Sequence, residues 1–349
     1  MASSSLVRIA VVGDIVMLFP PCDFGEEDVP LVQSVAALPF PKAVILGNHD
    51  AWNTQKFSSG VSMVWYMFLS ANQTAFKCNS IVYCYLVFLS CYMYVNEAAA
   101  MLVLLFIVQQ FCLGDEHVGY QRLDFPSLKL SIVGGRPFSH GGGSIASEKA
   151  SCPEVSIFDW QTCIFMYGVR DMDTSAGIIC RAAHGTPEDH VAIILAHNGP
   201  TGLGSQAEDI CGKDWGDEGG DHGDQDLEHA IRQLKETTKL SIPLVVFGHM
   251  HKELESGKGN RKMVVQDSDN QIVYLNGAIV PRIKEAKENC QGDSLSGADD
   301  SEKGGSTTRA FTLVEISDGK IKKITETWVQ VNGSIAKIVE EKTLFEDVT

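Results

Sequence analysis

Metal-competent side chains follow several apolar runs of the sequence, each directly after a small residue. These strand-end groups are Gly13-Asp14, Gly47-Asn48-His49, Ala196-His197, and Gly248-His249 with His251. Because ligands collect beyond the carboxyl ends of strands in open α/β sheets, we expect these side chains to converge on one rim. Imidazole, carboxylate and amide oxygen together suit Mn, Fe, Zn or Mg rather than a thiolate-bound metal.

The elements that must position these residues can be predicted from apolar periodicity. Strand-like runs cover 7–12, 16–19, 42–46, 191–195 and 242–247, and helical spacing covers 28–38 and 226–238. The second helix would be the crossover between the parallel strands 191–195 and 242–247. Near the C-terminus, 311–316 and 320–328 flank Ser317-Asp318-Gly319, a good hairpin turn. The fold class is therefore α/β, with a polar, mobile loop expected at 284–308.

Composition narrows the class of protein. The chain has 349 residues and a formal net charge of −16, and it contains no basic cluster, so a nucleic-acid-binding surface is disfavoured. Its ten cysteines form no CxxC pair and scatter through apolar stretches, which favours a reducing compartment. Met1 to Leu6 is too short for a cleavable signal before the first apolar run, so we expect a cytoplasmic protein.

Three motifs carry a resemblance to a known family. GNHD at Gly47 to Asp50, AHNGP at Ala196 to Pro200 and GHMH at Gly248 to His251 resemble the calcineurin-like metallophosphoesterase superfamily, in the branch found in plants and cyanobacteria. The resemblance implies a four-layer α/β/β/α sandwich over 7–332, followed by a C-terminal tail at 333–349. It also implies a dinuclear centre of two divalent metal ions at strand ends, with a small phosphorylated substrate.

The resemblance assigns a role to each motif residue. The implied metal ligands are Asp14, Asp23, Asn48, His197, His249 and His251, with Asp23 bridging both ions. His49, oriented by Asp50, would be catalytic and would stabilise the transition state or protonate the leaving oxygen. Two such ions clamp the phosphoryl oxygens and activate the water that attacks in line.

Other polar residues are weaker candidates. Arg136 follows an apolar run and Gly134-Gly135 and could clamp a phosphate through its fork of donors, although an ordinary surface arginine is an equal alternative. Asn198, next to His197, is a candidate substrate contact. The acidic, glycine-rich loop 216–226 could be a lid or an additional cation site, and a solvated acidic loop is the alternative.

The sequence departs from the family pattern in two places. The first family motif is DxH, but Asp14-Ile15 is followed by Val16, and too few residues separate the first two strand-like runs for a parallel crossover. The apolar stretch 61–112 has no family counterpart. A skipped exon and a translated intron would explain both features. The apolar runs within 81–108 are shorter than the roughly 18 residues of a transmembrane helix, and a membrane hairpin remains an alternative to a buried segment.

The predicted function follows from these observations. We expect a metal-dependent hydrolase acting on a small phosphomonoester or phosphodiester, impaired in this form because a first-motif imidazole is missing. The alternative is a catalytically inactive metal- or partner-binding relative, with membrane association through 81–108 as a further option.

Overall fold

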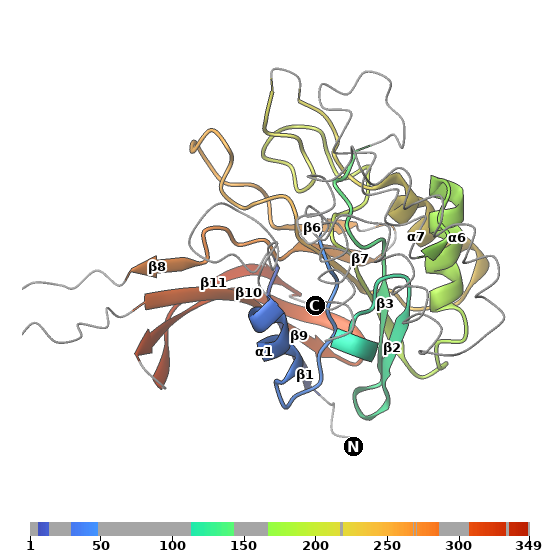
Figure 1. Ribbon diagram of the computed structural model, residues 1–349, viewed down its shortest axis with the longest axis horizontal. Helices are drawn as coiled ribbons and strands as arrows, with labels where there is room; N and C mark the ends of the chain where they lie inside the picture. Colours follow the sequence, from blue (N-terminus) through green and yellow to red (C-terminus); the bar gives the residue numbers. More distant parts are fainter. Residues whose placement is uncertain are drawn as a thin grey trace, which may run out of the picture.

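The computed structural model describes residues 6–13, 29–47, 113–142, 167–216, 219–267, 269, 271–285, 307–332 and 335–347. The predicted strand at 16–19, the whole apolar insertion 61–112 and most of the polar loop 284–308 lie outside these ranges. The described part is built from two β-sheets and a small number of helices (Figure 1). Its mixed α/β character agrees with the predicted fold class.

One sheet has six strands, in the order β2-β3-β4-β5-β7-β6. The strands are β2 (Arg122–Phe125), β3 (Leu130–Gly134), β4 (Val191–Leu195), β5 (Leu244–Phe247), β6 (Val264–Asp267) and β7 (Ile272–Asn276). β3, β4, β5 and β7 run parallel, while β2 and β6 lie antiparallel at the two edges. Helix α7 (Gln225–Thr237) connects β4 to β5, which confirms the predicted crossover.

The other sheet has five strands, in the order β1-β9-β10-β11 with β8 paired to β9. They are β1 (Leu6–Val11), β8 (Ile283–Glu285), β9 (Thr307–Ser317), β10 (Lys320–Asn332) and β11 (Ile335–Glu346). The β9–β10 hairpin is the one predicted. Its central residues Asp318 and Gly319 both have positive φ, 52° and 74°, as a type I′ turn requires.

Two boundaries differ from expectation in this sheet. The ends of the predicted polar loop 284–308 belong to β8 and β9, which pair with each other. The predicted tail 333–349 contains β11, because the long β10 offers its second edge to an antiparallel partner. The alternation of apolar and charged residues in β11 was too weak to indicate a strand from the sequence.

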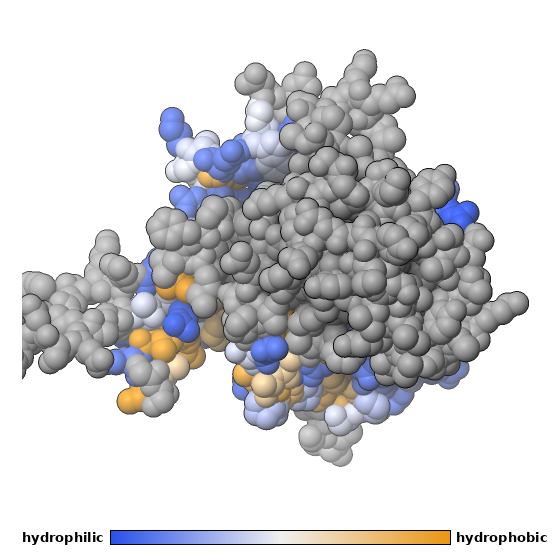
Figure 2. Space-filling view, viewed as in Figure 1, coloured by the Kyte–Doolittle hydropathy of each residue, from blue (hydrophilic) through white to orange (hydrophobic). Residues whose placement is uncertain are grey.

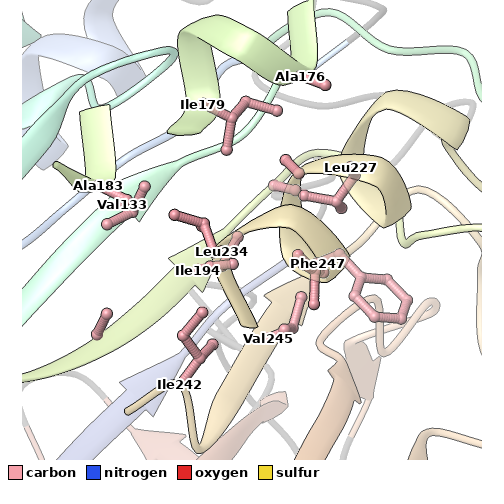
Figure 3. Packing of buried hydrophobic residues seen from close by; sticks show 14 of the residues in the cluster. Val133, Ala176, Ile179, Ala183, Ile194, Leu227, Leu234, Ile242, Val245 and Phe247 are labelled. Carbon is pink, nitrogen blue, oxygen red and sulfur yellow. The ribbon is translucent and has the colours of Figure 1, made fainter. Parts of the chain in front are cut away.

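The layers follow from two hydrophobic clusters. Helices α6 (Met172–Ala183) and α7 cover one face of the six-stranded sheet, where Ile179, Leu227 and Leu234 pack against Ile194 and Val245 (Figure 3). The opposite face packs on the five-stranded sheet. Described residues thus form a helix–sheet–sheet order, and the outer helical layer of a four-layer sandwich stays a prediction.

Helix α1 (Val29–Ala36) was predicted over 28–38, and it packs beside the sheets rather than between them. Val32 contacts Leu46, Leu113 and Phe138 in a small separate cluster. The predicted strand 42–46 is wrong for the described chain, since only Val44 forms a bridge, to His117. Two short 3-10 helices, η2 (Gly114–Glu116) and η3 (Pro126–Leu128), complete the connections.

The two edges of the five-stranded sheet differ in character. Within the described ranges, β1 pairs only with β9, in an unbroken register. β11 is interrupted by register shifts opposite Ile324/Thr325 and Trp328/Val329. Apolar side chains reach the surface toward the far end of the β10–β11 hairpin, where Ile335 is 71% exposed (Figure 2). None of the helices in the described ranges has the length and apolar character needed to cross a bilayer.

Candidate functional site

Two of the predicted metal ligands meet at the carboxyl ends of adjacent parallel strands. His197 follows β4 and His249 follows β5, and their ring centroids are 5.0 Å apart. Gly248 N–H donates to the His197 carbonyl at 2.9 Å, which holds the two loops together. Both imidazoles thus lie at the carboxyl edge of the sheet, where their position after apolar runs led us to expect them. His251 follows in the same loop, and its backbone carbonyl accepts a hydrogen bond from Arg261 Nε at 3.0 Å.

Two further imidazoles that no motif predicted lie against His249. The rings of His222 and His249 are nearly parallel, at 21°, with centroids 5.9 Å apart. The ring of His140 lies 6.5 Å from that of His249, on the loop after β3. These residues, with His197, are called the imidazole cluster below. They escaped sequence reasoning because His140 and His222 do not directly follow a strand, although His222 stands in the acidic loop that was singled out.

The backbone at His249 is held in an uncommon conformation. Its φ of 66° lies in the left-handed region, which is uncommon for residues other than glycine. Asn276, fully buried at the end of β7, donates from Nδ2 to the Met250 carbonyl at 2.6 Å. Its Oδ1 accepts the Ala278 N–H at 2.9 Å. Asn276 is therefore a positioning residue for the loop that carries His249.

The protonation of His249 is set by its surroundings. Burial lowers its pKa well below the usual value, and the nearby imidazoles of His197, His222 and His140 oppose an added positive charge. His249 Nε2 lies 3.1 Å from the His140 carbonyl oxygen, so Nε2 is the donor and the lone pair lies on Nδ1. Burial also lowers the pKa of His222. Neutral imidazole is the form that binds a metal ion.

Arg136 is buried beside the cluster and pairs with two carboxylates. Its Nη2 contacts Asp224 Oδ1 at 2.8 Å and its Nε contacts Asp226 Oδ2 at 3.0 Å. Arg136 and Asp224 are 3% and 1% exposed. Burial raises the pKa of Asp224 to about 6, against the opposing effect of Arg136. This arrangement favours internal positioning over the phosphate clamp proposed from the sequence.

Asn198 links this ion pair to the imidazole cluster. Its Nδ2 donates to the His222 carbonyl at 2.8 Å and lies 3.4 Å from Asp224 Oδ1. Asn198 is completely buried, and its Oδ1 has no hydrogen-bond partner within the described chain. Buried amide oxygens are rarely left in that state, so this atom is available to a ligand.

The acidic loop 216–226 is not a solvated loop in its described part. Asp221 Oδ2 accepts from Thr201 Oγ1 at 2.6 Å and from Gly202 N–H, and Asp221 Oδ1 accepts from Gly223 N–H at 2.8 Å. Asp224 and Asp226 are held by Arg136. These carboxylates thus shape the loop that delivers His222.

The remaining sequence-predicted site residues, Asp14, Asp23, Asn48, His49 and Asp50, lie outside the described residues. Gly13, the residue before Asp14, is described and shows where this segment leaves β1. Gly13 donates its N–H to the Gly277 carbonyl at 3.2 Å, and a Cβ on Gly13 would lie 2.8 Å from the Gly277 carbonyl carbon. The glycine is therefore required for close approach to the end of β7, beside the loop that Asn276 anchors.

The donor atoms at this site are of the chemical types that metal ions bind. No three His, Cys, Asp or Glu side chains in the described ranges are arranged to hold an ion by themselves. The imidazoles of His197 and His249, with the lone pair of the latter on Nδ1, and the buried Asn198 Oδ1 nevertheless give the nitrogen and oxygen donors that Zn, Mn and Fe accept. The other ligands expected from the resemblance are Asp14, Asp23, Asn48 and His251.

A cavity of about 330 Å³ adjoins the cluster. His197 and Gly248 line it, together with residues 10–13 at the end of β1 and with 42–45 and Gly47. The walls are mostly aliphatic. The cavity thus separates the end of β1 from the segment that was predicted to be a strand.

Comparisons of the chain with protein-family models, curated proteins and solved structures find no match. The function is therefore inferred from the motifs and from the site geometry.

Proposed function

We propose that the chain is a metal-dependent phosphoesterase with a four-layer α/β/β/α sandwich, acting on a small phosphomonoester or phosphodiester. The observation that carries the proposal is the contact between His197 and His249 at the ends of adjacent parallel strands. Their ring centroids are 5.0 Å apart. Both residues come from the motifs that resemble the metallophosphoesterase superfamily. Buried imidazoles gathered at one rim are costly unless a ligand or hydrogen bond compensates them.

The roles of the residues follow from the donor types. Metal ions would be held by Asp14, Asp23, Asn48, His197, His249 and His251. When bound, two divalent ions would supply positive charge for the phosphoryl oxygens and would activate a water as the nucleophile. His49, oriented by Asp50, would stabilise the transition state or protonate the leaving oxygen. Asn276 fixes the loop of His249, and Asn198 fixes His222.

Two observations support reduced activity in this form. Val16 stands where the family motif has a histidine, so one ion would lose an imidazole ligand. The second observation is the 330 Å³ cavity between the end of β1 and residues 42–47, which offers room for the segment that the resemblance expects after Asp14. We expect a form of the protein that contains the segment missing between Asp14 and Asp23 to fill this space and to regain activity.

Metal stoichiometry tests the proposal directly. Full-length protein is dialysed against Mn²⁺ or Zn²⁺, its metal content is measured by mass spectrometry, and phosphomonoesters and phosphodiesters are then screened. We expect at least one ion per chain, lost in His249→Ala and retained in His184→Ala, a matched control on an exposed histidine. A wild-type chain that binds no ion and hydrolyses no ester would contradict the proposal, as would unchanged metal content in His249→Ala.

A catalytically inactive relative that binds metal or a partner is the second candidate, favoured by Val16. It predicts retained metal without hydrolysis. Turnover that disappears in His49→Ala would decide for the enzyme.

A further inference from the structure

Aromatic rings lead from the surface to the imidazole cluster. The indole of Trp215 meets the ring of His222 edge-on, with centroids 4.7 Å apart at 86°. His222 then stacks on His249 at 5.9 Å. Trp215 is 36% exposed, so one end of this series faces solvent and the other end is the proposed phosphoryl site.

The loop that carries Trp215 is fixed by a buried guanidinium. Arg261, 3% exposed, donates from Nη1 to the carbonyls of Ala207 and Asp209, each at 2.8 Å, and to that of Gly212. Its Nη2 pairs with Asp214 Oδ1 at 2.9 Å. Asp214 directly precedes Trp215, so the indole is presented by an ordered backbone. A preorganised aromatic side chain binds a ligand at a small entropic cost.

The two arms of this loop are also joined to each other. Gly212 and Asp221 form an antiparallel bridge, His222 N–H donates to the Cys211 carbonyl at 2.9 Å, and Lys213 N–H donates to the Gly220 carbonyl at 2.8 Å. Trp215 and His222 therefore stay beside each other. Lys213 Nζ lies 5.9 Å from the Trp215 ring centroid, which adds a positive charge at the same surface.

We propose that Trp215 and His222 form a subsite for the leaving group, and that the preferred substrates are phosphoesters of planar aromatic groups, such as aryl or nucleoside phosphates. A phosphoryl group near His197 and His249 would direct its leaving group along the ring series toward the indole. The exposed indole stacks on the planar group, and Lys213 suits a substrate with additional negative charge. This inference rests on the proposed phosphoesterase function.

The test uses two non-hydrolysable probes, phenylphosphonate and methylphosphonate, titrated by calorimetry into the metal-loaded full-length chain. We expect phenylphosphonate to bind about tenfold more tightly than methylphosphonate, since stacking on an aromatic side chain supplies a gain of this order. Trp215→Ala should lose that preference, while Trp215→Phe should keep most of it. Leu128→Ala, a similarly exposed apolar residue at 39%, is the matched control and should leave the preference unchanged.

The outcomes separate the two proposals. A Trp215→Ala variant that still prefers phenylphosphonate would overturn the leaving-group subsite and leave the phosphoesterase proposal standing. Binding of neither probe to the wild-type chain would overturn the phosphoryl site itself, and the subsite with it. Loss of the preference in Leu128→Ala as well would assign it to general destabilisation and also overturn the subsite.

Discussion

His222 and His249 lie ring over ring, 21° from parallel, although one belongs to the loop after β4 and the other to the loop after β5. Because β4 and β5 are parallel neighbours, both loops leave the sheet at the same edge. The contact therefore depends on the sheet topology and on the hydrogen bonds that return the first loop to the site. Predictions about the site can be tested by disturbing those supports separately.

Gly141→Ala should displace His222. Gly141 has a φ of +74°, and a Cβ there would overlap the His222 carbonyl oxygen and lie 2.5 Å from Asn198 Nδ2. We expect a loss of about 2–4 kcal/mol in the free energy of unfolding, from the left-handed backbone and the steric overlap together. Urea denaturation measures it. Gly257→Ala is the control, because its φ is +65° but its Cβ would meet nothing within 4 Å. Equal losses in the two variants would contradict the overlap with His222.

Arg136→Met should destabilise the protein strongly. The substitution leaves the buried carboxylates of Asp224 and Asp226 without their positive partner. A loss of about 3–5 kcal/mol is typical when one member of a buried ion pair is removed. Arg232→Ala, which breaks an exposed pair with Glu228 within α7, should change stability by no more than about 0.5 kcal/mol. Similar values for the two variants in chemical denaturation would show that burial of the Arg136 pair has little effect.

The contribution of His117 to stability should fall as the solution is acidified from pH 6.5 to 4, while the raised pKa of Asp224 acts in the opposite direction, so the effect is measured as a difference between variants. Burial lowers the pKa of His117 from 6.5 to about 4, so the unfolded chain takes up a proton that the folded chain excludes over this range. The loss caused by His117 begins below pH 6.5 and reaches about 3 kcal/mol at pH 4. Between these two pH values, the unfolding free energy of His117→Asn should therefore fall by about 3 kcal/mol less than that of the wild type, and His184→Ala should follow the wild type. Superimposable profiles for wild type and His117→Asn would rule this out.

Metal removal should lower the melting temperature. An ion that binds only the folded state stabilises it by about 2.7 kcal/mol at a concentration of 100 times its dissociation constant. Differential scanning fluorimetry with and without a chelator should therefore show a shift for the wild-type chain and a smaller one for His197→Ala. An equal shift in the wild-type chain and in His197→Ala would place the bound ion away from β4.

Peptide mass spectrometry of the native protein tests the interpretation of the gene structure. A skipped exon and a translated intron predict that no native peptide joins Ile15 to Val16 and that none covers 81–106. Detection of both peptides would show that the unusual N-terminal region belongs to the native protein.

Part of the fold could be predicted because its signals are local. The β-branched runs at 191–195 and 242–247 end in small residues, and the intervening helical pattern is long enough for a crossover. Asp318-Gly319 likewise specifies its hairpin by local backbone preference. By contrast, 42–46 has strand-like residues but lacks a ladder partner in the described chain beyond the Val44 bridge. A strand exists only where a neighbour provides its hydrogen bonds.

The candidate site could also be predicted only in part. His197 and His249 could be found because each directly follows a strand. His140 and His222 depend on distant contacts, such as the bond from Gly142 N–H to the His222 carbonyl, 3.0 Å long. Arg136 looked like a phosphate ligand because the sequence does not show that Asp224 and Asp226 fold back onto it.

The contrast between β1 and β11 bears on how concentrated the protein can become before it self-associates. β11 carries lysines and glutamates and two irregularities, features that prevent another strand from adding to an edge. β1 is aliphatic apart from Arg8, its register is unbroken, and Leu6 is 48% exposed at its start. In the described part of the chain, the edge that is open to an added strand is therefore the short apolar one. If association through this edge limits the working concentration, a charged residue in place of Leu6 should raise that limit.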